Sequence, residues 1–182
     1  MLVKHNSYYR LLGISICFSL LLLGGFLLPK NYEVIRSIDI DRSHQAVYPY
    51  INDLQQWSKW TTLNQQHDPS LQLKYSSKSQ GEGAWQSWKS KQLGNGQLTI
   101  KESYPLEGVK YVMHIDNDFH IDGQLKITPN LESESTKITW IYRGNLGNNP
   151  VLRYIGLNID NALGKDLETG LQQLKSLVED NP

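Results

Sequence analysis

Residues 97–142 read QLTIKESYPLEGVKYVMHIDNDFHIDGQLKITPNLESESTKITWIY, and most of the fold follows from this stretch. Apolar and polar residues alternate in four of its segments: 97–103, 109–115, 119–128 and 136–142. Alternation with a period of two is the pattern of a strand that buries one face. Turn-forming residues separate the segments at 105–108, 116–118 and 130–135. The stretch therefore predicts a strongly curved antiparallel sheet with one apolar face.

The region that follows the strands changes to helical spacing. Apolar residues recur there every three or four positions: Ile155, Ile159, Leu163, Leu167, Leu171, Leu174 and Val178. This spacing predicts one long amphipathic helix, whose apolar stripe needs a large apolar partner. The sheet offers the only large apolar face in the sequence, so we expect the helix to cover it.

The region before the strands is expected to add further strands and two short helices. Three segments are strand candidates: 32–40 (YEVIRSIDI), 71–75 and 83–88. Two segments are expected to be short helices, 44–52 and 54–60, and the N-cap candidates Asp41-Arg42-Ser43 precede the first. Gly94-Asn95-Gly96 is a strong signal for a hairpin.

The N-terminal region contains an uncharged apolar run of 18 residues, from Leu11 to Leu28. As a helix this run would be about 27 Å long, close to the ~30 Å hydrocarbon thickness of a bilayer. A cleaved signal peptide is the alternative, but it has a shorter apolar core and a small-residue cleavage site. We therefore expect residues 1–30 to be an uncleaved single-pass anchor and residues 31–182 to form one domain.

The side of the membrane on which the domain lies is harder to predict from the charges that flank the apolar run. Lys4 and Arg10 precede the apolar run, and Lys30 and Arg36 follow it, so the positive-inside rule is nearly tied. A short basic N-terminus usually stays in the cytoplasm. The domain is therefore expected outside the cytoplasm, in the periplasm if the protein is bacterial. The lone Cys17 follows Ile16 rather than a small residue, which disfavours a lipoprotein signal.

Charge and composition exclude several classes of function. All 18 acidic residues and 15 of the 18 basic residues follow Lys30, which gives that part a net charge of −3. A weakly acidic domain with mixed charges has no electrostatic footprint for nucleic acid. One cysteine permits no intrachain disulfide. The sequence shows no phosphate-binding loop or nucleophile elbow, and we expect no cofactor. It leaves the oligomeric state open.

The order of elements resembles the α+β helix-grip fold, in which a curved antiparallel sheet wraps around a long C-terminal helix. The residues from 32 to 179 look like the SRPBCC or START-like superfamily, within the polyketide cyclase/dehydrase and lipid transport group. The resemblance rests on these motifs: Ile38-Asp39-Ile40, Ser43, Val47-Tyr48, Asn52-Asp53-Leu54, Trp57, Trp60, Gly81, Gly83, Trp88, Gly94, Gly96, Thr99-Ile100, Glu102, Thr136-Lys137-Ile138-Thr139-Trp140, Gly164-Lys165-Asp166-Leu167-Glu168 and Gly170-Leu171. Such proteins include lipid carriers, cyclases, hormone receptors and chaperone activators, so the resemblance does not fix an activity.

The resemblance implies a cavity between the sheet and the helix. Most of its expected lining residues have inward parity on their strands or lie on the helix stripe: Ile100, Glu102, Tyr111, Met113, Trp140, Tyr142, Leu163 and Leu167. Only one of Trp85 and Trp88 can point inward, and the resemblance favours Trp88. The alternative is that these residues make a solid core. Gly156, Gly164 and Gly170 cost the helix roughly 1 kcal/mol each, which indicates close packing or space for a ligand. The alternative for Gly156 is that it lies in an irregular segment that leads into the helix.

Two groups of residues are candidates for chemistry. Glu102 shares parity with Leu98 and Ile100, so it faces the cavity if the strand keeps its register, and it is then the best acid/base candidate, with Tyr111 or Tyr142 as its partner. The alternative is a strand end where Glu102 reaches water and pairs with a Lys or Arg. The segment 114–122 (HIDNDFHID) is rich in metal-ligand types. His114 and His120 have outward parity, however, and their spacing matches no metal motif. We therefore interpret the segment as a polar hairpin and expect no metal.

Three functions remain open from the sequence. The leading hypothesis is a membrane-anchored domain that binds a lipid or another hydrophobic small molecule. The second is a cyclase- or hydrolase-like enzyme that uses Glu102 and a tyrosine, and it is the less favoured of these two. The third is a ligand-free protein that helps a membrane complex to assemble. A cavity below about 300 Å³, the lower end for ligand pockets, would favour the third.

Overall fold

The computed structural model describes residues 3–116, 119–130 and 132–181 of the 182-residue chain. Within this part, seven strands form one antiparallel sheet in the order β1-β7-β6-β5-β4-β3-β2. The strands are β1 (Asn31–Ile40), β2 (Gln72–Tyr75), β3 (Trp85–Lys89), β4 (Asn95–Tyr104), β5 (Gly108–Ile115), β6 (Phe119–Asn130) and β7 (Ser135–Asn145). The helices are α1 (Val3–Leu27), α2 (His44–Asn52), α3 (Leu54–Trp57), α4 (Pro150–Gly156) and α5 (Ile159–Glu179).

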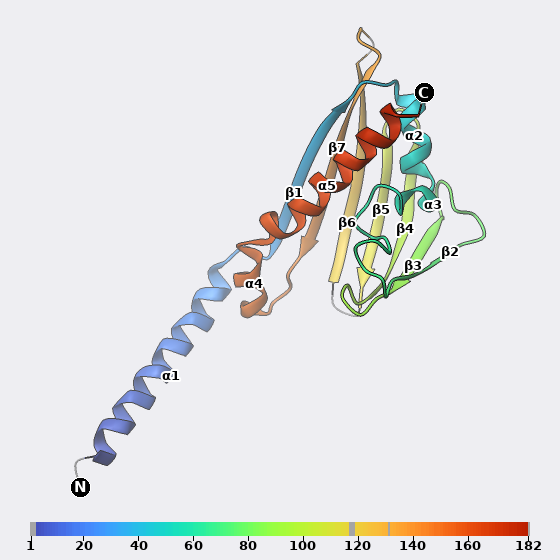
Figure 1. Ribbon diagram of the computed structural model, residues 1–182. Coiled ribbons are helices and arrows are strands. Elements are labelled where there is room, and N and C mark those ends of the chain that lie inside the picture. The colour runs from blue at the N-terminus through green and yellow to red at the C-terminus, as the bar shows by residue number, and fades with distance from the viewer. Residues whose placement is uncertain (1–2, 117–118, 131, 182) are drawn as a thin grey trace.

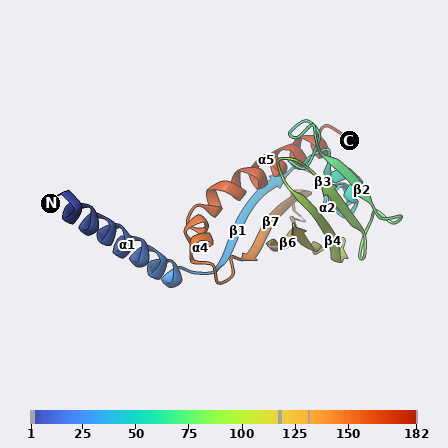
Figure 2. The ribbon, with the colours of Figure 1, turned by 90° about the horizontal axis from the view of Figure 1, so that it is seen from below.

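The sheet and the last long helix form two layers, and α1 projects away from them (Figure 1). Figure 2 shows the sheet curving, with α5 along the side of β1 and β7 and with α2 near the other strands. Hairpin connections join β3 through β7, because each of these strands is antiparallel to the next. This is the helix-grip fold that the sequence predicts.

The core lies between the concave face of the sheet and the helices. The inward residues that the alternation predicts are buried or nearly so: Leu98, Ile100, Tyr111, Met113, Ile121, Leu125, Ile138 and Trp140. Opposite them, α5 buries Leu167, Leu171, Leu174 and Val178. Trp57 and Trp60 also meet in this core, with ring centroids 5.3 Å apart.

The predicted single helix over 155–178 is wrong at its start. The chain forms the short helix α4, then bends at Leu157 and Asn158 before α5 begins at Ile159. Hydrogen bonds from the Leu157 and Asn158 amides to Tyr154 and Ile155 close this bend. The physical reason is that α4 packs against α1 rather than against the sheet, so the two helices need different directions.

Two glycines of α5 allow close packing. A Cβ atom at Gly170 would lie 2.7 Å from Cζ3 of Trp140, and one at Gly164 would collide with the Arg36 guanidinium. Arg36 in turn pairs with Asp160 at 3.0 Å and with Glu168 at 2.5 Å, which fastens the start of α5 to β1. Close packing therefore explains these two helix glycines.

Three smaller predictions need comment. The Gly94-Asn95-Gly96 hairpin is present, but its loop runs from 90 to 94 because Asn95 already pairs with Lys89. The second short helix ends at Trp57 rather than at residue 60. The predicted turns at 116–118 and 130–135 include residues 117, 118 and 131, which lie outside the described residues, so these turns stay predictions.

In the described part of the chain, one helix is long and apolar enough to cross a membrane, over Tyr9–Leu27. Its side chains are mostly exposed. It leads into β1 through residues 28–30, so the sheet begins almost directly after it.

Candidate functional site

A cavity of about 190 Å³ lies between the sheet and the first half of α5. It sits at one end of the strands, beside Ile115 at the end of β5 and Ile121 near the start of β6. Its walls are largely aromatic and aliphatic: Trp57, Leu63, Trp88, Leu93, Leu98, Met113, Ile115, Ile121, Trp140, Tyr142 and Leu163. The polar wall residues are Thr61, Thr62, Gln86 and Asp166. An apolar hollow with a few polar groups has the general character of a small-molecule site.

The structure divides the residues expected to line this cavity into three groups. Five of them form part of its wall: Trp88, Met113, Trp140, Tyr142 and Leu163. Ile100, Tyr111 and Leu167 are buried in the solid core beside it. Glu102 lies in neither place. Residues with the same inward parity therefore lie either in the cavity wall or in the solid core. Their position along the strand or helix decides which.

The expectation that Glu102 faces the cavity is wrong. The β4–β5 register shifts between Ile100 and Glu102, because a bulge at Lys101 adds one residue. The bulge reverses the parity, so Glu102 pairs with Lys110 at 2.7 Å on the outer face. This ion pair raises the pKa of Lys110. Glu102 therefore has no access to the cavity.

Trp88 and Gln86 are two buried residues of β3 in the cavity wall, and Trp88 Nε1 is the atom of this pair that is fully buried without a hydrogen-bond partner. Trp88 is 3% exposed, and its Nε1 donor has no hydrogen bond within the described residues. Gln86 is 2% exposed, and no other described residue bonds to its side-chain amide. Burying an unpaired polar group costs about 1–3 kcal/mol, so such groups are uncommon and need an explanation.

The two tyrosines near the cavity differ in their partners. The Tyr111 hydroxyl accepts a hydrogen bond of 2.7 Å from Nε1 of Trp140, so it is already engaged within the core. Tyr142 lies in the cavity wall, and burial raises its pKa to about 12. Both hydroxyls are therefore neutral at physiological pH, which suits hydrogen bonding rather than proton abstraction.

Asp166 brings a carboxyl group to the cavity from α5. Loss of hydration at the cavity rim raises its pKa, and His67 partly opposes this effect. The residue is exposed, so it marks the solvent-facing side of the cavity. Asp166 was part of the family motif, but its position in the wall was not predicted.

A polar network holds the loops that close the cavity. The Asp68 carboxylate accepts hydrogen bonds from the hydroxyls of Ser70 and Ser90, and the Ser90 hydroxyl accepts one from the Leu93 amide at 2.7 Å. These hydroxyls lower the pKa of Asp68. The network therefore ties the loop before β2 to the 90–94 loop, which carries the wall residue Leu93.

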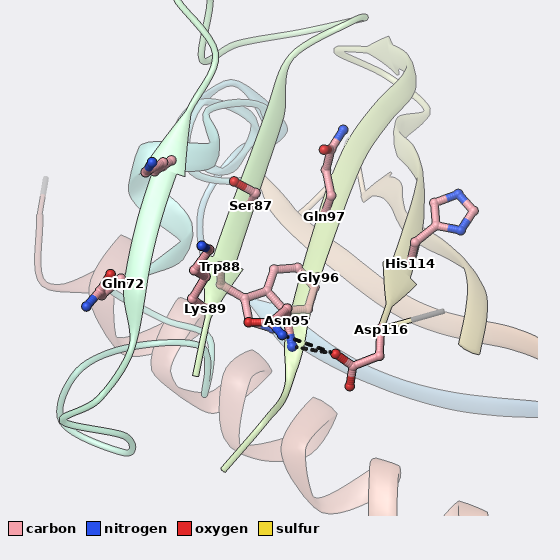
Figure 3. A pocket seen from close by; sticks show the side chains of 10 residues that line it. Gln72, Ser87, Trp88, Lys89, Asn95, Gly96, Gln97, His114 and Asp116 are labelled. Carbon is pink, nitrogen blue, oxygen red and sulfur yellow. Dashed lines mark hydrogen bonds between the residues drawn. The ribbon is translucent and has the colours of Figure 1, made fainter. Parts of the chain in front are cut away.

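A second hollow lies on the outer face of the sheet, over β2 to β5. Figure 3 shows Ser87, Gln97 and His114 along three neighbouring strands, with Asn95 bonded to Asp116 at the end of the groove. Its volume is about 490 Å³, but its lining side chains are mostly exposed and hydrophilic. The Trp88 ring packs under Gly96 and so separates this groove from the cavity.

The two histidines of the 114–122 segment face outward, as their parity predicts. Their ring centroids are 4.8 Å apart, and His120 Nε2 lies 3.1 Å from Asp122. Among the described residues no group of three potential ligands could hold a metal ion. The geometry therefore provides no metal-binding arrangement in the part of the chain that the structure describes.

Several residues of the cavity wall were not predicted from the sequence, although strand parity could have identified one of them. Gln86 lies two residues before Trp88 on β3, so the same inward parity applied to it. Leu63 and Leu93 lie in loops, where no periodic pattern indicates which way a side chain faces. Only the folded arrangement of these loops brings them to the cavity.

Comparison with known proteins agrees with this architecture. A family model described as polyketide cyclase / dehydrase and lipid transport matches residues 32–179. The chain therefore belongs to this family of helix-grip proteins. No curated protein matches the sequence.

Solved structures with low identity share the fold. A hypothetical protein of Helicobacter pylori has a TM-score of 0.62 at 8% identity, covering 81% of this chain and 88% of its own. A Staphylococcus aureus protein of unknown function has a TM-score of 0.61 at 13% identity, covering 82% and 96%. A Chromobacterium violaceum protein has a TM-score of 0.56 at 15% identity, covering 83% and 99%. At these identities the likeness concerns the fold alone.

Proposed function

We propose that this protein is a membrane-anchored binding domain that holds a lipid or another hydrophobic small molecule between the sheet and α5. In this proposal residues 1–30 are the anchor and residues 31–182 are the binding domain. The observation that carries it is a mostly apolar cavity whose wall includes Trp88, a residue with a buried and unpaired Nε1 donor. A ligand with an apolar body and one hydrogen-bond acceptor would satisfy both features.

The size of the cavity limits the ligand. Its volume of about 190 Å³ is below the roughly 300–1,000 Å³ of sites for drug-sized ligands. The expected ligand is therefore small, or it is a longer amphiphile that inserts one end. The acceptor of that end would face Trp88 and Gln86, and its apolar body would contact Met113, Leu163 and their neighbours.

Ligand-free assembly is the second candidate, and the same volume favours it. A protein that only supports a membrane complex needs no ligand space, and a hollow this small could be a packing void. The catalytic candidate has lost its support, because Glu102 lies outside the cavity and was its proposed acid or base. The wall offers Asp166 as its only carboxylate among the described residues, and that residue is exposed.

Native mass spectrometry of the full chain, released from detergent, tests ligand binding. We expect a bound apolar molecule, or a rise in melting temperature with one member of a panel of fatty acids and single-chain amphiphiles. The proposal fails if nothing co-purifies and no compound shifts the melting temperature. That result would support the assembly candidate.

The substitution Trp88→Phe tests the role of the unpaired donor. It removes one hydrogen bond to the ligand, so the affinity should fall by about 2- to 12-fold. Trp85→Phe is the matched control, because Trp85 lies three residues earlier on β3 and faces the other side. Equal effects of the two substitutions would contradict the proposed contact.

The anchor and its orientation need a separate measurement. Membranes from cells that express the full chain should keep the protein after an alkaline carbonate wash. A cysteine introduced at the exposed Leu106 should react with an impermeant maleimide in intact cells if the domain faces outward. Labelling only after the cells are broken would show the opposite orientation.

A further inference from the structure

Helix α4 lies beside the end of α1 and presents exposed apolar side chains. Four large apolar side chains on α4 or just after it are exposed: Val151 by 53%, Tyr154 by 38%, Ile155 by 61% and Leu157 by 65%. Arg153 is the only charged residue in its sequence, PVLRYIG. A surface of this kind usually marks an interaction with a partner or a membrane.

Close contacts fix α4 beside the last two turns of α1. A Cβ atom at Gly25 would lie 2.7 Å from the Cβ atom and the carbonyl oxygen of Pro150, so only glycine permits this approach. The Tyr154 hydroxyl donates a hydrogen bond of 2.7 Å to the carbonyl oxygen of Leu21. Figure 1 shows α4 between α1 and α5. The position of α4 along the membrane normal is therefore fixed by the position of residues 21–28 of the anchor.

The one charge of α4 is used within the protein. Nη1 of Arg153 donates to the carbonyl oxygens of Phe26, at 2.9 Å, and of Leu28, at 3.3 Å. Its guanidinium carbon also lies 5.9 Å from the centroid of the Phe26 ring. The last carbonyl groups of a helix have no hydrogen-bond donors within that helix. Arg153 acts as such a donor at the end of α1. The side chain is 9% exposed, so the outer surface of α4 is uncharged.

We propose that α4, together with Leu157, binds the lipid bilayer at the boundary between headgroups and acyl chains, as a second membrane contact beside α1. This inference rests on the proposed anchoring by α1. The rise from Leu21 to Leu27 along a helix is about 9 Å, which matches the ~5–10 Å to which interfacial helices enter a membrane. A bilayer that covers α1 as far as Leu27 therefore reaches Tyr154 and Ile155.

The consequence concerns the orientation of the domain. A single helix lets a domain rotate about its anchor, whereas two contacts fix one face toward the membrane. Helix α4 leads directly into α5, whose first turns carry Leu163 of the cavity wall. Membrane contact by α4 therefore holds the cavity end of the domain near the bilayer.

Depth-dependent fluorescence quenching of the full chain in phosphatidylcholine vesicles tests this proposal. An environment-sensitive fluorophore is placed on Ile155→Cys in a Cys17→Ser background, and the vesicles carry lipids with a nitroxide on an upper acyl carbon. We expect a blue-shifted emission and a loss of emission by quenching. Leu106→Cys is the matched reference, since Leu106 is equally exposed but lies in the β4–β5 turn, at the other end of the strands.

Leu23→Cys, on the exposed face of α1, separates the proposed anchoring by α1 from the proposed membrane contact by α4. Quenching at residues 23 and 155 but not at 106 supports the proposal. Quenching at 23 alone overturns the contact by α4 and leaves the anchor in place. No quenching at either position overturns the anchor as well.

A second variant tests whether docking on α1 places α4. Gly25→Leu should push α4 away from α1 and reduce the quenching at residue 155. Gly13→Leu is the control, because nothing lies within 4 Å of a Cβ atom at Gly13. Unchanged quenching in Gly25→Leu would contradict the proposed placement.

Discussion

The two ends of the space between the sheet and α5 are stabilised by different interactions. Toward the C-terminus, α5 buries Leu167, Leu171, Leu174 and Val178 almost completely. The rings of Trp60 and Trp140 meet where this end borders the cavity, with centroids 5.2 Å apart, and the Trp140 ring also packs on Gly170. This packed end is stabilised mainly by apolar burial.

Toward the start of α5 the same two layers leave the cavity. Leu163 is only partly buried there, and loops rather than helix turns complete the wall. These loops are held by polar contacts around Asp68 and by the Asn64 side chain, whose Nδ2 donates to the Thr61 carbonyl oxygen at 2.7 Å. The apolar burial that stabilises the fold is therefore concentrated at the packed end, and the proposed ligand would occupy the other end. Four predictions test this contrast.

The largest expected effect is at the packed end. Leu171→Ala removes a fully buried side chain and leaves a cavity, so the free energy of unfolding should fall by about 4 kcal/mol. Leu163→Ala should cost about 1 kcal/mol, because that side chain is only partly buried. Chemical denaturation of the full chain in detergent measures both. Similar losses would show that the two ends are equally well packed.

The polar network at the cavity end is expected to respond to pH. The hydroxyls of Ser70 and Ser90 lower the pKa of Asp68 below 3.8 in the folded state. This contribution to stability is therefore complete above the ordinary pKa and is lost as the pH falls through the lowered value. Asp68→Asn should remove that part of the acid sensitivity, and its cost at neutral pH should be smaller than that of Leu171→Ala.

Denaturation curves of the wild type and of Asp68→Asn, from neutral pH to about pH 3, give this comparison. Asp160 and Glu179 also have lowered pKa values, so the wild type and the variant should share the acid sensitivity that these groups cause. Identical pH profiles would show that the Asp68 network does not stabilise the loops.

Larger side chains should affect the two ends in opposite directions. Leu171→Phe overfills the packed end and should cost about 2 kcal/mol. Leu163→Phe can enter the cavity and should stabilise the protein by about 1 kcal/mol. The same variant should weaken ligand binding, since the ring takes the space of the ligand. Thermal unfolding and ligand-induced shifts measure the two effects. A loss of stability in Leu163→Phe would show that no usable space exists.

The smallest expected effect is at Glu102. The ion pair with Lys110 lies on the outer face and is about half exposed at both side chains, and such surface pairs contribute little. Glu102→Gln should leave both unfolding and ligand binding unchanged within error. A clear loss of binding would place Glu102 at the ligand and restore the acid/base hypothesis.

Much of the cavity wall could be predicted from the sequence, but the positions of some residues could not. Parity placed Tyr142 inward and His114 outward, and the structure has them so, whereas the choice of Trp88 over Trp85 came from the family resemblance. Parity failed at Glu102, because one bulged residue reverses every later parity and no sequence signal marked the bulge. It also could not separate Leu163 in the wall from Leu167 in the core, since both lie on the same helical stripe.

The sequence by itself determined the local structure: the period-two strands, the amphipathic helix and the apolar N-terminal run. These patterns are local, because each strand or helix must present its apolar residues on one face. Only the tertiary structure decided where α4 separates from α5, how Arg153 closes the end of α1 and where the core stops and the cavity begins. Those features depend on contacts between different helices, strands and loops, such as the one from Arg153 to Phe26, and no local pattern encodes such contacts.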